Sequence, residues 1–343
     1  MRIALEPHLE ELARQNAWFV FSCSGGKDSG ASMHAACQWL DSVGHDPAKR
    51  LALHADLGRA KWPDTLDTVQ KVANHCGVPL ETVTQKNDLV WRFQDRWKRS
   101  LARYQNLETI QLVPPWSSSS LLFCRSEQKE VTLCKYKKDL DGDLPIVGVI
   151  GIRREESTRR ANAPVFHADN ALLRRNKREG YLWNPIVEWT TEEVFQYHRD
   201  HNIPLHRAYG LGSTRLSCAL CVLGSKNDIG VSIAAGNHDV LASYIELELT
   251  SAFSFQSNAW LADRAPDGMV DVSRLENAKR IAAERQRLQE SMPPTLRKSK
   301  SINGISRNDA VTLANIRGQI CALYDISTPY DSVDAIIALA ASK

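Results

Sequence analysis

The sequence predicts an α/β protein built on a doubly wound parallel sheet, followed by a helical C-terminal extension. Short apolar segments alternate with amphipathic ones at the spacing of βαβ units through the first part of the chain. The loop after the first apolar segment is rich in glycine and serine, as expected where a strand enters a helix beside a ligand. After about residue 235 the pattern becomes helical. We therefore expect a nucleotide-binding domain over 1–235 and a helical region over 236–343.

The first elements follow from apolar runs and stop signals. Residues 6–16 predict a short helix leading into a strand, and Gly44 and Gly77 each end a later helix. A prolyl residue, Pro63, opens the second of these helices. The expected strands are 18–23, 51–56, 80–84 and 146–152, and the expected helices are 28–43, 63–76 and 89–104, with a loop over 111–120.

Later elements are marked by capping signals. Thr190 and Glu193 form a capping box that begins a helix running to about His201. Helices are also expected over 278–289 and 306–324, and the polar, basic stretch 292–304 between them predicts a mobile linker.

Composition limits the class of protein. The chain has 343 residues, a net charge of +3 and 43% hydrophobic residues, which are ordinary values for a globular protein. No apolar run reaches the roughly 18 residues of a membrane span, and the N-terminus has no signal-peptide core. We therefore expect a cytoplasmic protein without a membrane partner. Eight cysteines in such a chain favour metal-binding or catalytic thiols over disulfides.

The most informative segment is Ser24-Gly25-Gly26-Lys27-Asp28-Ser29, between an expected strand and an expected helix. Glycines let the backbone approach a ligand, and exposed amides at the helix start face an anion. The serine hydroxyls add donors and Lys27 adds a positive charge. The segment therefore predicts a phosphate-binding loop. The plain alternative is a surface Gly-Ser turn with an incidental lysine.

This loop is neither a Walker A loop nor a Rossmann fingerprint, because its glycines are adjacent and Asp28 follows the lysine. It resembles the PP-loop of the ATP-pyrophosphatase superfamily, whose fold is adenine nucleotide alpha hydrolase-like. The resemblance implies cleavage of ATP between the α- and β-phosphates and adenylation of an acceptor. It further implies that Ser24, Gly25, Gly26, Lys27 and Ser29 hold the pyrophosphate, while Asp28 helps to place Mg²⁺.

Two further segments resemble the phosphoadenylyl-sulfate (PAPS) reductase branch of this superfamily. Asp56-Leu57-Gly58 with Pro63-Asp64-Thr65 is similar to its Asp-Thr-Gly…Pro-Glu-Thr stretch, although Leu57 and Asp64 depart from that pattern. The resemblance implies that Asp56 and Gly58 line the adenosine side. The alternative for Asp56 is an ordinary turn residue at a strand end.

The segment from Gly151 to Arg160 is similar to the Gly-x-Arg-x-x-Glu-Ser-x-x-Arg stretch of the same branch. Guanidinium groups bind phosphate or sulfate oxygens in a bidentate manner, so we expect Arg153 and Arg160 to bind the anionic group of the acceptor. A solvated basic face with local ion pairs is the alternative.

Four cysteines are candidate metal ligands. The block from Asn184 to Thr190 followed by Arg215-Leu216-Ser217-Cys218-Ala219-Leu220-Cys221 completes the resemblance, which covers about residues 16 to 225. In relatives a cysteine in the Cys124 position joins the Cys-x-x-Cys pair at an iron–sulfur or zinc centre, and Cys134 is the candidate fourth ligand. The expected set is therefore Cys124, Cys134, Cys218 and Cys221, holding a [4Fe-4S] cluster or zinc. A redox pair, or reduced packing thiols, are the alternatives.

The Glu-Cys-Gly-x-His motif with which PAPS reductases reduce sulfate is not found, and Cys321 stands in a different context. The resemblance therefore favours a relative that transfers sulfur, such as the ATP-pyrophosphatase component of DNA phosphorothioation systems. The expected partners are ATP, a cysteine desulfurase as sulfur donor and DNA as acceptor, since basic residues cluster over 153–178 and 91–99. A PAPS or adenylyl-sulfate reductase, and a non-enzymatic nucleotide or iron–sulfur sensor, stay open as alternatives.

Overall fold

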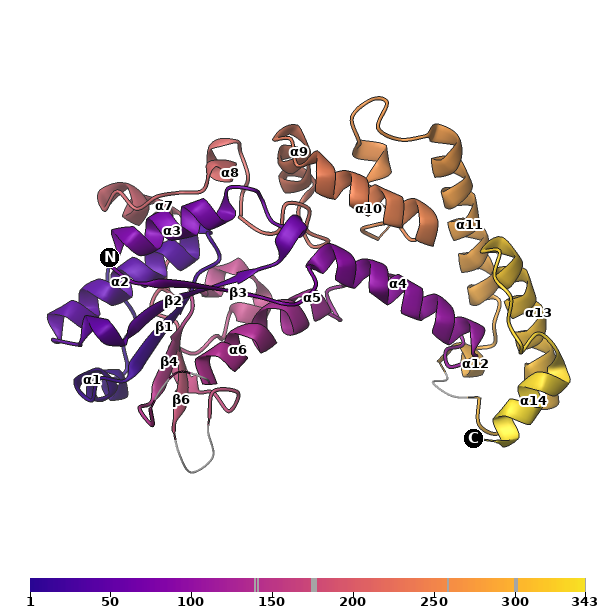
Figure 1. The fold of residues 1–343 in the computed structure, drawn as a ribbon, viewed down its shortest axis with the longest axis horizontal. Helices are drawn as coiled ribbons and strands as arrows, with labels where there is room; N and C mark the ends of the chain where they lie inside the picture. Colours follow the sequence, from indigo (N-terminus) through magenta and orange to yellow (C-terminus); the bar gives the residue numbers. More distant parts are fainter. Residues whose placement is uncertain (139, 141, 174–177, 258, 299–301, 343) are drawn as a thin grey trace. The chain divides into compact units, whose positions relative to one another are not determined.

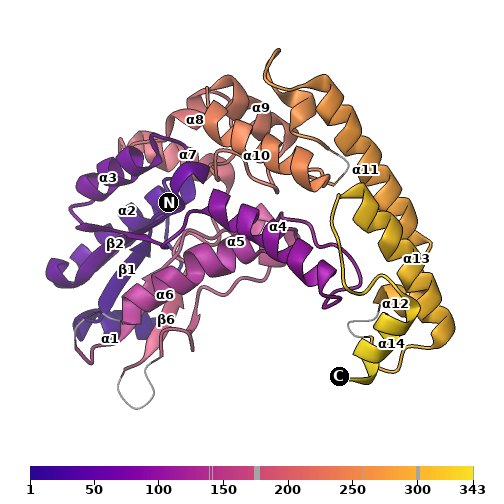
Figure 2. The same cartoon turned by 45° about the vertical axis from the view of Figure 1, so that its right-hand side comes forward.

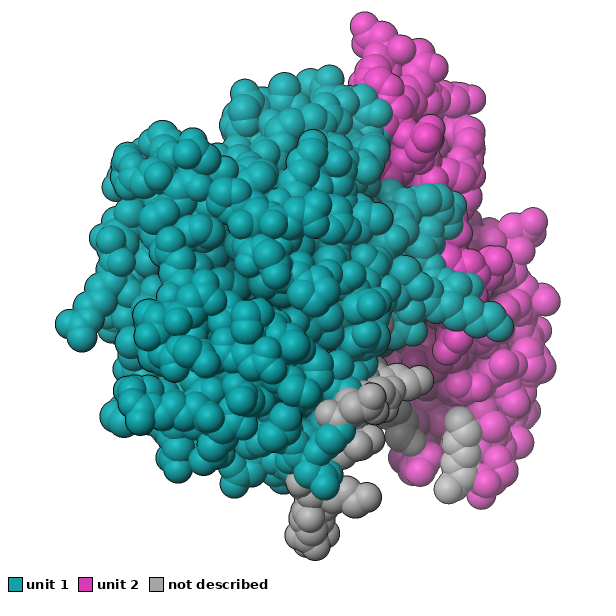
Figure 3. Space-filling view, turned by 60° about the vertical axis from the view of Figure 1, so that its left-hand side comes forward, with its two compact units in different colours: residues 1–89, 119–237 teal, residues 90–118, 238–343 magenta. Residues whose placement is uncertain are grey.

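The computed structural model describes residues 1–138, 140, 142–173, 178–257, 259–298 and 302–342. The chain divides into two compact units, coloured separately in Figure 3. Unit 1 consists of residues 1–89 and 119–237, and unit 2 of residues 90–118 and 238–343. The second boundary lies close to the division expected after residue 235. The sequence does not, however, indicate that 90–118 belongs with the C-terminal helices.

Unit 1 is built on one sheet, which has six strands in the described residues, in the order β3-β2-β1-β4-β6-β5 (Figure 1). The strands are β1 (Trp18–Ser22), β2 (Arg50–Asp56), β3 (Leu80–Thr84), β4 (Ile146–Val149), β5 (Phe166–Ala168) and β6 (Gly180–Trp183). Neighbouring strands are parallel except for β5 and β6, which are antiparallel. The expected parallel α/β sheet is confirmed, while β5 and β6 add an edge that the sequence does not predict.

Helices cover both faces of this sheet. They are α1 (Pro7–Arg14), α2 (Lys27–Ser42), α3 (Thr65–His75), α5 (Phe123–Arg125), α6 (Val131–Lys138), α7 (Thr191–Asp200), α8 (Arg207–Gly210) and α9 (Lys226–Ala234). Figure 2 shows α6 on the opposite side of the sheet from α2 and α3. The sheet is therefore doubly wound, as expected.

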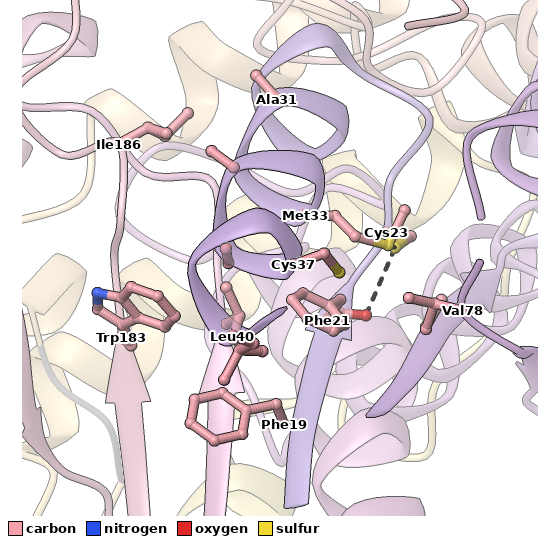
Figure 4. Packing of buried hydrophobic residues seen from close by; sticks show 14 of the residues in the cluster. Phe19, Phe21, Cys23, Ala31, Met33, Cys37, Leu40, Val78, Trp183 and Ile186 are labelled. Carbon is pink, nitrogen blue, oxygen red and sulfur yellow. Dashed lines mark hydrogen bonds between the residues drawn. The ribbon is translucent and has the colours of Figure 1, made fainter. Parts of the chain in front are cut away.

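The two faces carry separate hydrophobic clusters because side chains alternate along a strand. Phe19 and Phe21 of β1 point to the face of α2, where they pack with Met33 and Trp183 (Figure 4). Val20, between them, packs on the other face with Leu53, Ile146 and Leu172, and residues of α6 lie against this second cluster. These clusters fix the sheet and hold the start of α2 at the carboxyl end of β1.

The predicted capping box at the start of α7 is confirmed. Glu193 N–H donates to Thr190 Oγ1 at 3.2 Å, and Thr190 N–H donates to Glu193 Oε2 at 2.7 Å. The strand–loop–helix order around the glycine-rich segment is also confirmed, since β1 ends at Ser22 and α2 begins at Lys27.

Unit 2 is helical in its described residues. Its helices are α4 (Leu89–Gln105, whose first residue belongs to unit 1), α10 (His238–Ser251), α11 (Val272–Glu290), α12 (Pro294–Lys298), α13 (Arg307–Leu323) and α14 (Val333–Ala341). Aromatic side chains explain why 90–118 belongs here. Trp116 packs against Phe93, Tyr244 and Phe255, and its indole N–H donates to Phe253 O at 3.0 Å.

The stretch 292–304 differs from the expected polar linker. It contains α12, and Met292, Leu296 and Ile302 are buried, so apolar contacts hold its described part in place. Residues 299–301 lie outside the described residues. Within the part of the chain that the structure describes, no helix combines the length and the apolar character required to cross a membrane.

Candidate nucleotide site

The glycine-rich loop adopts a conformation that depends on its glycines. Gly25 has φ +83°, a left-handed conformation that favours glycine. A β-carbon at Gly25 would also lie 3.1 Å from Thr65 Cγ2, so the loop packs directly on the start of α3. Ser24 Oγ accepts from Gly26 N–H at 3.3 Å and lies 3.1 Å from Ser29 Oγ. Of the five residues predicted to hold pyrophosphate, Ser24, Gly25 and Gly26 thus form a tight turn, and Lys27 and Ser29 lie in the first turn of α2.

The lysine of the loop points into the protein. Its side chain is 3% exposed, and Lys27 Nζ donates to Asp28 Oδ2 at 2.9 Å. The ammonium lies 5.6 Å from the ring centroid of Phe195 and 5.9 Å from that of Tyr209. In this conformation the positive charge is neutralised by Asp28 rather than offered to solvent.

Arg153 reaches the same carboxylate from the segment after β4. Its Nε donates to Asp28 Oδ1 at 2.6 Å. Its two terminal nitrogens donate to Glu155 at 2.9 Å, to Trp189 O at 3.3 Å and to Thr191 Oγ1 at 3.1 Å. The side chain is 3% exposed. The predicted role in acceptor binding is therefore not visible in this conformation, where the guanidinium is occupied by the protein itself.

Arg160 lies closer to solvent. It pairs with Glu156, whose carboxylate also accepts from Arg153 N–H at 3.2 Å, and its side chain is 32% exposed. The structure therefore connects the two arginines through Glu156 while leaving only Arg160 partly accessible. Arg154, between them, pairs with Glu188.

Two residues that contact the loop, Tyr209 and His198, are not marked by any pattern in the sequence. Tyr209 Oη accepts from Lys27 N–H at 2.9 Å and from Leu216 N–H at 3.3 Å. His198 Nε2 hydrogen-bonds to Lys27 O at 2.7 Å, and burial lowers the pKa of this histidine. Both lie more than 170 residues from the loop along the chain, and no local pattern marks them.

The second predicted segment lies at the end of β2. Asp56 Oδ1 accepts from Gly58 N–H at 2.9 Å, which is the turn geometry considered as the alternative for this aspartate. Gly58 has φ +62°, and a β-carbon there would lie 2.5 Å from Asp88 Cβ. Because β1, β2 and β4 are parallel, Asp56, the glycine-rich loop and Gly151 all lie at their carboxyl ends. The three predicted segments therefore share one edge of the sheet.

The cysteines are only partly brought together. Burial first, and then the charge of Cys218, raise the pKa of Cys221, and Cys124 adds to the effect, so these three thiols lie within electrostatic range. Cys134 packs instead against the cluster around Val20 on the face of α6. Cys124 and Cys134 lie ten residues apart on one helical run from 123 to 138, whose middle part, Ser126–Glu130, is a π-helix.

The predicted four-cysteine centre is thus not assembled. Among the residues that the structure describes, no three His, Cys, Asp or Glu side chains are arranged to hold a metal ion. The four thiols are not gathered around one point in this conformation, and the four-cysteine centre stays a prediction.

The Cys-x-x-Cys segment adjoins the nucleotide edge. Ala219 N–H donates to Ala60 O at 2.8 Å, which ties the segment to the turn after β2. Burial first, and then the charge of Lys129, lower the pKa of Lys61 to about 8, while the nearby Cys218 acts in the opposite direction. The Lys61 ammonium therefore lies within electrostatic range both of Asp56 at the nucleotide edge and of Cys218 in the cysteine pair.

A small pocket lies beside the two cysteines. It is lined in part by Trp62, Arg215, Cys218, Cys221 and Asp228. Burial alone would raise the pKa of Asp228, but hydrogen bonds from Thr214 and Ser225 outweigh it and lower that pKa. The pocket therefore places a carboxylate and a guanidinium next to two thiols.

The basic stretches expected to contact DNA combine buried side chains with exposed ones, among them Trp91 and Arg99 of α4. In α4, Phe93 and Trp97 are core residues with exposures of 2% and 6%, and Arg99 pairs with Asp95. In the 153–178 stretch Arg178 is buried, and residues 174–177 lie outside the described residues. The aromatic spacing in α4 thus reflects packing in unit 2.

Comparison with known proteins identifies the family of the chain. A model of the phosphoadenosine phosphosulfate reductase domain matches residues 18–223. An uncharacterized 37.8 kDa protein of Escherichia phage 186 is 24% identical over 274 residues, covering 70% of this chain and 77% of its own length. Adenosine 5'-phosphosulfate reductase of Allochromatium vinosum is 25% identical over 181 residues, covering 53% of this chain and 60% of its own.

A crystal structure of PAPS reductase from Candida auris in a phosphate complex aligns with a TM-score of 0.40 and 17% identity, covering 64% of this chain and 98% of that one. The family match spans well over half of the sequence and includes the glycine-rich loop, the segment after β4 and the Cys-x-x-Cys pair. The chain therefore belongs to the phosphoadenosine phosphosulfate reductase domain family.

Proposed function

We propose that this protein is an ATP pyrophosphatase that adenylates an acceptor for sulfur transfer. One observation carries the proposal: Ser24, Gly25 and Gly26 form a tight turn, with Gly25 at positive φ, and Lys27, Asp28 and Ser29 follow as the first turn of α2. The first amides of a helix lack intrahelical acceptors and favour an anion at that position. A polyphosphate is the ligand that suits such a turn with serine hydroxyls and a nearby lysine.

In the proposed reaction, Ser24, Gly25, Gly26, Lys27 and Ser29 hold the β- and γ-phosphates, and the turn of Asp56 and Gly58 borders the adenosine. An oxygen of the acceptor forms a bond to the α-phosphorus while the bond to the bridging oxygen breaks. AMP passes to the acceptor, and pyrophosphate leaves with the bonding electrons. Positioning and charge stabilisation supply most of the acceleration in such transfers.

Magnesium enters this scheme as the ion carried by ATP. Both carboxylate oxygens of Asp28 already accept from cationic side chains, Lys27 and Arg153. The observed conformation therefore does not offer Asp28 as a vacant Mg²⁺ ligand. The metal would neutralise phosphate charge while bound to ATP.

The Cys-x-x-Cys pair suits a sulfur carrier. A cysteine desulfurase would load one thiol as a persulfide, whose terminal sulfur displaces AMP from the adenylated acceptor. The second thiol then releases the sulfur by forming the Cys218–Cys221 disulfide, and an external dithiol reduces that disulfide. The short spacing of the pair and its tie to the turn after β2 support this assignment.

DNA is the proposed acceptor class. Arg160, partly exposed beside the nucleotide edge, is the candidate contact for a backbone phosphate. A fold does not fix the substrate, so DNA is tested as an added component in the assay below.

A PAPS or adenylyl-sulfate reductase is the second candidate, favoured by the names of relatives such as the Allochromatium vinosum enzyme. In the structure Cys321 is 6% exposed, and burial raises its pKa, so it is a poor candidate for the reducing thiol.

One experiment separates these functions. Pure protein is incubated with Mg²⁺ and α-labelled ATP, with and without DNA, and in parallel with PAPS or adenylyl sulfate and a dithiol. We expect AMP and pyrophosphate from ATP, in larger amount with DNA. Sulfite release with intact ATP would favour the reductase. Binding of nucleotide without turnover, even with DNA and a cysteine desulfurase present, would favour a sensor.

A further inference from the structure

In this conformation the side chain of Lys27 is turned into the protein. Its ammonium pairs with Asp28 and lies beside the rings of Phe195 and Tyr209, and its side chain is 3% exposed. If the loop binds a polyphosphate, as proposed above, the ammonium must leave Asp28 to reach the ligand. Such a move would normally leave a partly buried carboxylate without a partner, which is strongly unfavourable.

Arg153 keeps Asp28 paired when Lys27 leaves. It donates to Oδ1 of Asp28, whereas Lys27 donates to Oδ2, so the two cations occupy different oxygens of one carboxylate. When Lys27 departs, Asp28 keeps a charged hydrogen bond of 2.6 Å. Charge-assisted bonds of this kind are among the strongest side-chain interactions.

Arg153 is itself fixed by groups that do not depend on Lys27. Its terminal nitrogens donate to the side chains of Glu155 and Thr191 and to Trp189 O. Glu155 also accepts from Thr191 N–H at 2.8 Å, at the first turn of α7. The planar guanidinium can donate hydrogen bonds to all these acceptors at once, which an ammonium cannot.

We propose that Arg153 is a positioning residue that releases Lys27 for the anion. On binding, Lys27 exchanges Asp28 for the phosphate oxygens, and Arg153 retains Asp28 in place. This inference rests on the proposed function of the loop, and it replaces direct binding of the acceptor by Arg153.

The test is a double-mutant cycle read by calorimetric titration with inorganic pyrophosphate in the absence of magnesium. Arg153→Met should raise the Kd by about tenfold or more, because Lys27 must then abandon an otherwise unpaired Asp28. In an Asp28→Asn background the same change should alter the Kd by less than about twofold, since no carboxylate is left behind. A purely structural role would give equal losses in both backgrounds.

Arg154→Met is the matched control, because this neighbouring arginine pairs with Glu188 and does not contact Asp28; its Kd should equal that of the wild type. If Arg153→Met does not fold, the cycle is run with Arg153→Lys, which keeps the charge but not the fork. Equal losses in both backgrounds would overturn the inference and leave the loop assignment standing. A wild-type protein that binds neither pyrophosphate nor ATP would overturn the loop assignment and the inference together.

Discussion

Gly151 lies directly against the backbone of Asp28. A β-carbon at Gly151 would stand 2.4 Å from Asp28 O and 2.9 Å from Ser29 N. The segment directly after β4 therefore supports the first turn of α2 through a contact that only glycine allows. This contact is backbone to backbone, so neither side can adjust by changing a side-chain rotamer.

We expect Gly151→Ala to displace the glycine-rich loop. Overpacking of this kind costs about 1–3 kcal/mol of unfolding free energy, and nucleotide binding should weaken by about tenfold or more. Calorimetry and nucleotide titration measure the two effects. Gly230→Ala in α9 is the control, because nothing lies within 4 Å of its β-carbon, and it should be neutral or slightly stabilising. Wild-type affinity in Gly151→Ala would contradict the proposed support.

Tyr209→Phe is expected to lower the free energy of unfolding by about 1–3 kcal/mol, because two backbone N–H groups, of Lys27 and Leu216, lose their acceptor. Denaturant titration gives the value. Tyr181→Phe removes a hydroxyl that donates to exposed Glu179 and serves as the control, with a smaller expected loss. Equal losses in the two variants would show that the Tyr209 hydroxyl does not hold the loop.

Stability should fall as the pH drops from about 6.5 towards 4. Burial first, and then the charges of His201, His75 and His198, lower the pKa of His34 to about 4. The ordinary value, about 6.5, applies to the unfolded chain, so between these pH values the unfolded state binds more protons and is favoured. The contribution of neutral His34 to the free energy of unfolding is complete above pH 6.5, and it is lost as the pH falls through the pKa of His34 in the folded protein.

Melting temperatures measured between about pH 6.5 and pH 4 test this expected loss of stability. His34→Gln should reduce the slope of melting temperature against pH. Part of the slope should remain, because burial also lowers the pKa of His54 to about 4. A slope unchanged by His34→Gln would refute the assignment to His34.

Thiol labelling should separate packing cysteines from the pair at the pocket. Burial raises the pKa of Cys23 and of Cys37 to about 12, so their thiolate fraction at pH 8 is on the order of 10⁻⁴. Iodoacetamide at pH 8, followed by peptide mass spectrometry, should therefore label Cys218 in the native protein and label Cys23 and Cys37 only after denaturation. Rapid native labelling of Cys23 would place it in the reacting site instead.

The sequence predicts the central part of the fold because that part is determined locally. The apolar run 18–21, the glycines and the helix start at Lys27 all lie within a few residues of one another, and the capping box at Thr190 spans four. Such short-range signals act through backbone sterics and hydrogen bonds that need no distant partner.

What the sequence misses depends on distant partners. Tyr209 meets Lys27 across 182 residues, and Arg153 meets Asp28 across 125. Basic and aromatic residues in α4 suggest a DNA contact, yet Phe93 and Trp97 pack in the core of unit 2. The spacing of side chains along one helix cannot distinguish a binding face from a buried one until the neighbouring elements are known.

The most direct test of the central claim is the release of AMP and pyrophosphate from α-labelled ATP by wild type, Lys27→Ala and Lys49→Ala. Lys49 is the control, since its ammonium lies 4.9 Å from the ring centroid of Trp18, at the start of β1 and away from the loop. We predict cleavage by wild type and Lys49→Ala, and a loss of about a hundredfold or more in Lys27→Ala, because a charge that stabilises the leaving pyrophosphate is removed. Unchanged cleavage by Lys27→Ala would contradict the assignment of this loop as the pyrophosphate site.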